Sequence, residues 1–254
     1  MSKDPTNIIS LPGLKAACRN CSLYHLCLPL GIDNEDMDEL DRIIRRKRPL
    51  RRGEYLFQAG DAFRAIYAIR SGSVKTFAAT EEGHEQVTGF HLPGELVGLD
   101  AIIRERHPCT SRALETTSVC EIPFDRLEEL GGKIPGLQRQ LLRLMSKELL
   151  EDEQLMMLLG KKSAESRLAA LLVSISERFK QRGFSAREFN LSMSRNDIAN
   201  YLGLAVETVS RLFTRFQAEG ILTADRKHLI LKDIDRLNCL ARPSGESRDR
   251  ELRK

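Results

Sequence analysis

The sequence predicts an α+β fold, with a strand-rich domain in the first half of the 254-residue chain and helices in the second half. The strands are indicated by glycines that recur between residues 49 and 125 at roughly the 8–12-residue spacing of turns in a sandwich or barrel. These glycines are Gly53, Gly60, Gly72, Gly83 and Gly94. The helices are indicated by the stretch from Leu137 to Leu159, which no glycine or proline interrupts.

The chain begins with a segment, residues 1–32, that contains three cysteines and shows neither helical nor strand periodicity. We expect a loop there. A short helix should follow, because Met37, Leu40 and Ile43 recur at helical spacing. Strand-like segments then lie between the turn glycines, namely Ala65–Arg70, Val74–Ala79, Glu85–Leu92 and Ser118–Ile122. We therefore assign residues 33–134 to one strand-rich domain.

Residues 135–160 form the next predicted element, a long helix that ends near Gly160 and the basic pair Lys161-Lys162. A seam runs along it in alternating steps of four and three, the spacing of a coiled coil. The seam comprises Leu141, Met145, Leu149, Asp152, Met156 and Leu159. Such a helix either packs on its own domain or pairs with a second copy of the chain. A narrow seam after a strand-rich domain favours a dimer helix.

Asp152 is the only acid on this seam. In a symmetric parallel dimer the two copies of that position face each other near the axis. Two carboxylates brought together there repel each other, so the dimer would lie near balance and a bound ligand could tip it. The alternative is that Asp152 faces solvent together with its neighbours Glu151 and Glu153.

Residues 161–240 are predicted to form a winged helix-turn-helix domain. Ser194 and Asp197 make an S-x-x-D capping box at a helix start, and Gly203 allows a tight turn before a second helix that begins near Val206. The expected inward side chains are Ile198, Ala199, Leu202, Val209, Leu212, Phe213 and Phe216. Two short apolar segments around a turn at 225–227 indicate a β-hairpin wing. The polar residues 241–254 are predicted to be disordered.

Three side chains share the outer face of the second helix: Glu207, Ser210 and Arg211. Arginine can bond the O6 and N7 atoms of guanine, glutamate can accept from cytosine N4, and serine can do either. On an isolated helix these residues would indicate only a solvated surface. At the start of the second helix of a helix-turn-helix they favour contact with DNA bases.

Composition sets limits on the function. Hydrophobic residues make up 41% of the chain and charged residues 30%, and the formal net charge is +4. These values permit a packed core and are compatible with a nucleic-acid partner. We expect a cytoplasmic location without a membrane partner, because no run approaches the roughly 18 apolar residues of a membrane span. The histidines form no metalloprotease or triad pattern, and no P-loop occurs, so we do not expect an enzyme.

The cysteines are the second candidate site. Cys18, Cys21 and Cys27 have the spacing C-x2-C-x5-C, which lets three thiolates converge on one metal or cluster. A fourth ligand must come from elsewhere, and Cys109 and Cys120 are both candidates. Zinc and a [4Fe–4S] cluster are both consistent with this spacing. Cys239 has no ligand-type neighbour, so we expect it to take no part.

Four motifs together resemble one family, the oxygen-responsive FNR/ANR regulators of the CRP/FNR superfamily. The motifs are C-x2-C-S-x4-C at Cys18–Cys27, F-H-L-P-G-E-L-V-G at Phe90–Gly98, A-L-E-T-T-S-V-C-E-I-P-F at Ala113–Phe124 and Y-L-G-L-A-V-E-T-V-S-R at Tyr201–Arg211. The resemblance implies an N-terminal β-roll like that of cyclic-nucleotide sensors, a long dimerisation helix and a winged helix-turn-helix.

The resemblance also implies a mechanism. It places the four ligands of an oxygen-labile [4Fe–4S] cluster at Cys18, Cys21, Cys27 and Cys120. It implies that the cluster favours a homodimer on two TTGAT-type half-sites of double-stranded DNA, with E-x-x-S-R at Glu207, Ser210 and Arg211. Oxygen would convert the cluster to a [2Fe–2S] form and return the protein to monomers. The loop Thr80–Glu85 resembles a contact surface for RNA polymerase.

Two alternatives keep the same fold without an iron–sulfur cluster. A cyclic-nucleotide receptor would hold a phosphate with a Gly-Glu pair and a later Arg-Ser/Thr-Ala triplet. Gly94-Glu95 is present, but the segment that follows, Arg104–Pro108, lacks the Ser/Thr-Ala part. A regulator stabilised by zinc at the cysteines is the other alternative.

Overall fold

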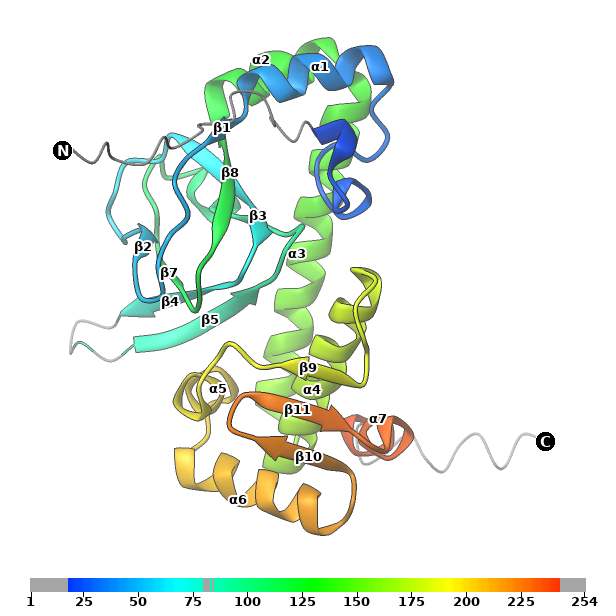
Figure 1. Cartoon of the computed structure of the whole chain (residues 1–254). Coiled ribbons are helices and arrows are strands. Elements are labelled where there is room, and N and C mark those ends of the chain that lie inside the picture. The colour runs from blue at the N-terminus through cyan, green and yellow to red at the C-terminus, as the bar shows by residue number, and fades with distance from the viewer. Residues whose placement is uncertain (1–17, 80–82, 84, 243–254) are drawn as a thin grey trace, which may run out of the picture.

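The computed structural model describes residues 18–79, 83 and 85–242. It consists of an N-terminal β-roll, a long helix that runs beside the roll and a C-terminal domain around the far end of that helix (Figure 1). This is the α+β architecture that the sequence predicts.

Two four-stranded antiparallel sheets form the β-roll. The strands of the first, in spatial order, are β1 (Arg45–Arg46), β8 (Ser118–Pro123), β3 (Ala65–Ser71) and β6 (Leu96–Val97). Those of the second are β2 (Tyr55–Phe57), β7 (Thr110–Ala113), β4 (Val74–Ala79) and β5 (Glu85–His91). All five turn glycines of the sequence have a positive φ, between 77° and 92°, a conformation that costs glycine little.

Short helices cover the end of the roll. Helix α1 (Asn34–Ile43) packs on α2 (Phe124–Lys133), and single helical turns occur at η1 (Cys18–Asn20), η2 (Tyr24–Leu26) and η3 (Leu99–Ala101). Helix α2 was not predicted from the sequence. Its buried side chains, Leu127 and Leu130, are helically spaced, but Gly131 and Gly132 have low helix propensity and conceal the pattern.

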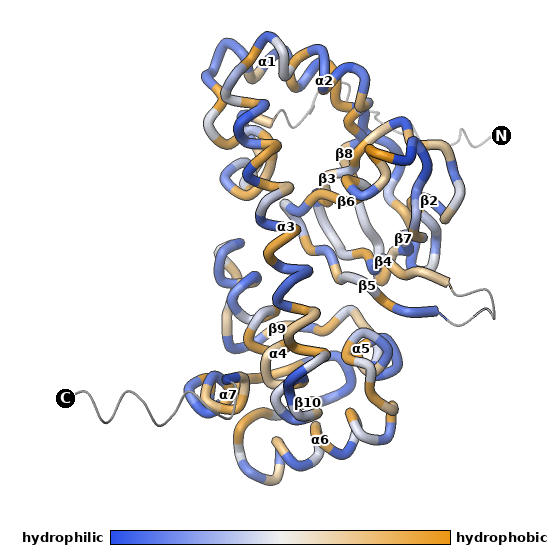
Figure 2. Tube along the Cα trace, turned by 180° about the vertical axis from the view of Figure 1, so that it is seen from behind, coloured by the Kyte–Doolittle hydropathy of each residue, from blue (hydrophilic) through white to orange (hydrophobic). Residues whose placement is uncertain are grey.

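Helix α3 (Pro135–Lys161) is the predicted long helix and ends within one residue of the expected position. Proline suits its first position because no intrahelical bond is lost there. Leu137 and Gln140 are buried near its start. Apolar residues continue along the later turns (Figure 2). Leu158 packs on the core of the C-terminal domain, whereas Leu149, Met156 and others are exposed.

The C-terminal domain contains the predicted helix-turn-helix and wing. Its elements are α4 (Ala164–Gln181), β9 (Glu188–Asn190), α5 (Arg195–Leu202), α6 (Val206–Ala218), β10 (Leu222–Asp225), β11 (His228–Leu231) and α7 (Ile234–Ala241). Strand β9 and helix α7 were not predicted, because three and eight residues are too few to show a clear period. Helix α7 continues to Ala241, one residue beyond the predicted end of the domain.

The C-terminal domain packs on the β-roll of its own chain. Helix α5 lies beside β5 (Figure 1), and one hydrophobic cluster joins Phe77, Val87 and Phe90 to the core of the C-terminal domain. Lys75 Nζ lies 2.7 Å from Asp197 Oδ1 across this interface. The two domains are therefore held together by both apolar and charged contacts.

None of the helices in the described part of the chain is long and apolar enough to cross a membrane.

Candidate metal centre and nucleic-acid interface

The structure brings four cysteines to one pocket. Cys18 begins η1, Cys21 follows that turn and Cys27 follows η2, so three of them lie on one compact segment. Cys120 comes from β8, where it pairs with Arg46 of β1 and Ala68 of β3. All four line the same pocket, although about 90 residues separate Cys120 from Cys27. The antiparallel pairing of β8 places it there.

The remaining wall of this pocket is mostly apolar. It is formed by Leu23, Tyr24, Leu28, Pro29, Leu40, Ile44, Ala68, Ile69, Arg70, Gly94 and Ile122. Within residues 18–79, 83 and 85–242, no three His, Cys, Asp or Glu side chains converge as they would around a single metal ion. Four thiols in a pocket with an apolar wall are a donor set that fits a polynuclear cluster held by four thiolates.

Burial changes the chemistry of these thiols. It raises the pKa of Cys18 and of Cys27 to about 12 each, and it also raises the pKa of Cys120. The thiols raise one another's pKa as well, since neighbouring thiolates repel. Arg46 acts in the opposite direction on Cys18 and Cys120. Without a cation the pocket therefore favours neutral thiols, and a metal would be needed to bind them as thiolates.

An ion pair that the sequence analysis missed anchors the cysteine segment. Asp41 of α1 accepts a hydrogen bond from the backbone N–H of Cys18 at 3.2 Å and one from Arg46 Nη2 at 2.6 Å. Burial acts to raise the pKa of Asp41, but these two hydrogen bonds lower it below its usual value. No sequence motif marks Asp41, because its contact with Cys18 joins residues 23 positions apart that only the fold brings together.

Gln140 of α3 makes a second contact with the cysteine segment that the sequence did not indicate. Its side chain is 4% exposed, and Nε2 donates to the carbonyl oxygen of Cys27 at 3.3 Å. Its Oε1 atom is buried without a hydrogen-bond partner among the described residues. The long helix is thus in direct contact with the backbone of one of the four cysteines.

The other two cysteines lie elsewhere. Cys109 is buried with Phe57, Ile69 and Val74 in a separate hydrophobic cluster. Its Sγ donates to Asp100 Oδ2 at 3.2 Å, and burial raises its pKa strongly. Cys239 is exposed on α7. Neither residue lines the pocket of the other four.

The helix-turn-helix has the expected local geometry. Ser194 Oγ accepts from the backbone of Asp197 at 3.1 Å, and Asp197 Oδ2 accepts from the backbone of Ser194 at 3.0 Å. Both halves of the predicted capping box are therefore present. Gly203 ends α5 with a φ of 60°, the left-handed conformation that the tight turn requires.

Glu207, Ser210 and Arg211 are all exposed on α6, opposite the buried side chains of Val209 and Phe213. Arg211 makes only a long contact with Thr208 Oγ1, at 3.4 Å. The described part of the chain leaves its guanidinium free to contact another molecule. Strands β10 and β11 form the wing beside this surface.

The predicted seam of α3 is largely exposed in the single chain. Met145 is 38% exposed, Leu149 63% and Met156 65%, and Asp152 is exposed among them. Leu141 instead packs partly on the β-roll. Leu142, Leu150 and Met157 widen the exposed apolar strip beyond the seam. This strip is larger than isolated surface residues would produce, which is typical of an interface.

The predicted polymerase contact, Thr80–Glu85, lies outside the described residues except for Gly83 and Glu85.

The fold and these two sites define a helix-turn-helix transcription regulator with a β-roll sensor domain. Family models agree: residues 47–132 match the cyclic nucleotide-binding domain and residues 166–240 the Crp-like helix-turn-helix domain. The solved structure of FixK2 from Bradyrhizobium japonicum is 30% identical, with a TM-score of 0.73 over 80% of this chain and 99% of that one.

Curated relatives are more similar in sequence. The chain is 57% identical to the transcriptional activator protein Anr of Pseudomonas aeruginosa, over 89% of this chain and 93% of that protein. It is 51% identical to the fumarate and nitrate reduction regulatory protein of Escherichia coli, over 90% and 92% of the two chains. The chain belongs to the FNR/ANR regulators of the CRP/FNR superfamily. Its relatives are DNA-binding transcription regulators and not enzymes.

Proposed function

We propose that this regulator responds to oxygen through a [4Fe–4S] cluster held by Cys18, Cys21, Cys27 and Cys120. With the cluster bound, a cytoplasmic homodimer forms along α3, binds two TTGAT-like half-sites through α6 and contacts RNA polymerase. The observation that supports this most directly is the single apolar pocket that the four cysteines line from two distant segments. When bound, the cluster would supply an oxygen-sensitive centre.

The chain's own residues provide the environment for such a group. The apolar wall limits access of water to the thiolates, and the Asp41–Arg46 pair fixes the start of the cysteine segment. Arg46 and Arg70 place positive charge near Cys120, which offsets part of the negative charge of the bound thiolates. Gln140 connects the segment to the helix on which dimerisation is proposed.

The two alternatives are less well supported. Glu95, which a cyclic-nucleotide receptor would use for its ligand, is paired with Arg178 and Arg182 of the same chain. A zinc ion needs four ligands at roughly 2.3 Å from one point. Four thiols could supply that set, and it is membership in the FNR/ANR regulators that favours a cluster over zinc.

Single cysteine variants test the proposal. After anaerobic reconstitution, the parent chain should show a broad visible absorption band with iron and sulfide bound, and the band should decay in air. Replacement of Cys18, Cys21, Cys27 or Cys120 by serine should abolish it, because each change removes one thiolate. Cys109→Ser is the matched control and should retain it. Loss of the cluster in Cys109→Ser with retention in Cys120→Ser, or a colourless zinc-loaded parent chain, would contradict the assignment.

A further inference from the structure

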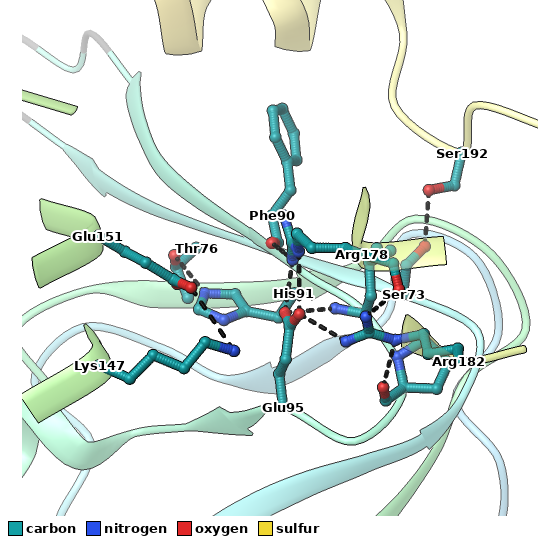
Figure 3. A network of polar contacts seen from close by, with 12 residues as sticks. Ser73, Thr76, Phe90, His91, Glu95, Lys147, Glu151, Arg178, Arg182 and Ser192 are labelled. Atoms are coloured by element: carbon teal, nitrogen blue, oxygen red, sulfur yellow. Dashed lines mark hydrogen bonds and ion pairs between the residues drawn. The ribbon is translucent and has the colours of Figure 1, made fainter. Parts of the chain in front are cut away.

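The Gly94-Glu95 pair has another role in this chain. Glu95 lies in the loop between β5 and β6, and its carboxylate bonds Arg178 in the last turns of α4 and Arg182, which directly follows that helix (Figure 3). Arg178 Nε lies 2.9 Å from Oε1, and Arg182 Nη2 lies 2.6 Å from the same oxygen. We call these three residues, Glu95, Arg178 and Arg182, the interdomain latch.

Further hydrogen bonds fix the latch on both sides. Arg178 donates to the carbonyl oxygen of Phe90, Arg182 donates to that of Pro93 at 2.6 Å, and Glu95 Oε2 accepts from the backbone of Leu92 at 2.9 Å. Burial acts to raise the pKa of Glu95, but the two guanidinium groups lower it to about 2. The carboxylate is therefore ionised at neutral pH. Charge-assisted bonds in a buried setting are among the stronger polar contacts, and breaking them leaves charges unpaired.

The same loop touches the cysteine segment. Gly94 has a φ of 92°, and a β-carbon built on it would lie 2.9 Å from Cβ of Leu26, so the Gly94 backbone lies directly against the Leu26 side chain. On the other side, His25 Nε2 lies 3.1 Å from the carbonyl oxygen of Gln181, in the last turn of α4. Residues Leu23–Leu26, between Cys21 and Cys27, thus contact the loop that carries Glu95 and also the end of α4 beside Arg182.

We propose that the interdomain latch transmits the position of Leu23–Leu26 to the C-terminal domain and so sets how that domain docks on its own β-roll. This inference rests on the proposed function in one respect only, namely that binding of the cluster orders Leu23–Leu26. This route differs from the proposed route to dimerisation, in which the cysteine segment contacts α3 through the hydrogen bond from Gln140 to Cys27. The regulator would then have two outputs, one at the dimer strip and one at the orientation of the DNA-binding domain.

Hydrogen exchange of the metal-free full chain tests the docking part. In Glu95→Gln, amides between Arg178 and Arg182 should exchange at least about tenfold faster, roughly the factor that loss of one charged hydrogen bond produces. Glu95→Asp should restore part of the protection. Glu177→Gln is the matched control, because it removes an exposed carboxylate from the same helix, and it should leave these rates unchanged.

A second variant keeps the latch testable if the Glu95→Gln protein does not fold. Arg182→Lys keeps a cation beside Glu95 as well as the pair between Glu95 and Arg178, and it should give a smaller acceleration at the same amides. Exchange in Glu95→Gln that equals the parent rate, or that rises equally across the whole chain, would overturn the latch.

Comparison of the reconstituted and metal-free forms tests the transmission. In the parent chain, cluster binding should change exchange at both 92–95 and 178–182. In Glu95→Gln, the change at 92–95 should persist and the change at 178–182 should disappear. An identical response at 178–182 in both chains would overturn the transmission. If no visible band forms at all, the proposed function fails, and the metal-free comparison still decides whether the latch holds the domain.

Discussion

We expect single side chains on α6 to set the DNA sequence that this regulator recognises, and Arg211 is the best placed of them. Its guanidinium is exposed on α6 with only a long contact to Thr208. Arg211→Ala should cost roughly 1–3 kcal/mol of discrimination at a guanine in each half-site, because a bidentate contact to O6 and N7 is lost. Binding to the cognate site and to single-base variants of it should be compared by titration at fixed salt.

Arg215 of the same helix provides the control for this measurement. Its guanidinium is already paired with Glu165 and Glu219, so Arg215→Ala should leave the preference at that base pair intact. If Arg211→Ala weakens binding to all DNA equally and preserves the preference, Arg211 contacts phosphate and the base contact must be assigned elsewhere.

Residues with a chemical signature could be found in the sequence, whereas residues that act through long-range contacts could not. The cysteine spacing and the E-x-x-S-R triplet drew attention to Cys18, Cys21, Cys27 and Arg211. The resemblance, and not the spacing, preferred Cys120 over Cys109. Asp41 and Gln140 carry no signature, since their roles arise only when a helix packs beside the cysteine segment.

The elements followed local rules where such rules are strong. Positive φ angles at the turn glycines, the capping box and the uninterrupted α3 were all predictable, because each depends on neighbours in the chain. Helix α2 was missed because Gly131 and Gly132 weaken its local signal. The docking of α5 on β5 was not predictable either, since ordinary alternation on β5 does not reveal its partner.

The contact between the Gly94 loop and Leu23–Leu26 provides a prediction at the scale of single elements. Gly94→Ala should displace Leu23–Leu26, because the new methyl group would meet Leu26 at 2.9 Å. We expect less iron and sulfide per chain after reconstitution and faster loss of the visible band in air. Gly53→Ala is the control, because its φ of 86° imposes the same backbone strain with nothing within 4 Å of the added atom. Equal iron contents in the two variants would show that the contact with Leu26 is unimportant.

At the scale of the whole molecule, α3 connects the domain that holds the cysteine pocket to the domain that holds the exposed face of α6. An apolar strip on α3 itself is exposed. The cysteine pocket contacts α3 near its start, through Gln140, and the exposed strip follows farther along the same helix. A change in the pocket can therefore reach this exposed apolar strip through a single continuous element. The exposed strip alone would favour permanent pairing, so a switch needs an opposing force.

Asp152 is the residue that we expect to supply this force. Its pKa is raised by the packing around it and by Asp100, and that of Glu148 is raised to about 7 by burial and by Asp152. Carboxylates are thus already close together around Asp152 in the single chain, and a second chain paired along α3 would bring a second set of them to the same place. The cluster would need to supply only a few kcal/mol to overcome such repulsion.

Asp152→Ala should therefore give a dimer that persists in air without a cluster and that binds the cognate DNA there. Sedimentation of the metal-free protein at matched concentrations measures this directly. Glu153→Ala is the control, because it removes a neighbouring acid that lies off the seam and should remain as monomeric as the parent. If Asp152→Ala also stays monomeric at the parent's concentration, or if both variants dimerise alike, repulsion at this position does not oppose the dimer and the switch must act through other contacts along α3.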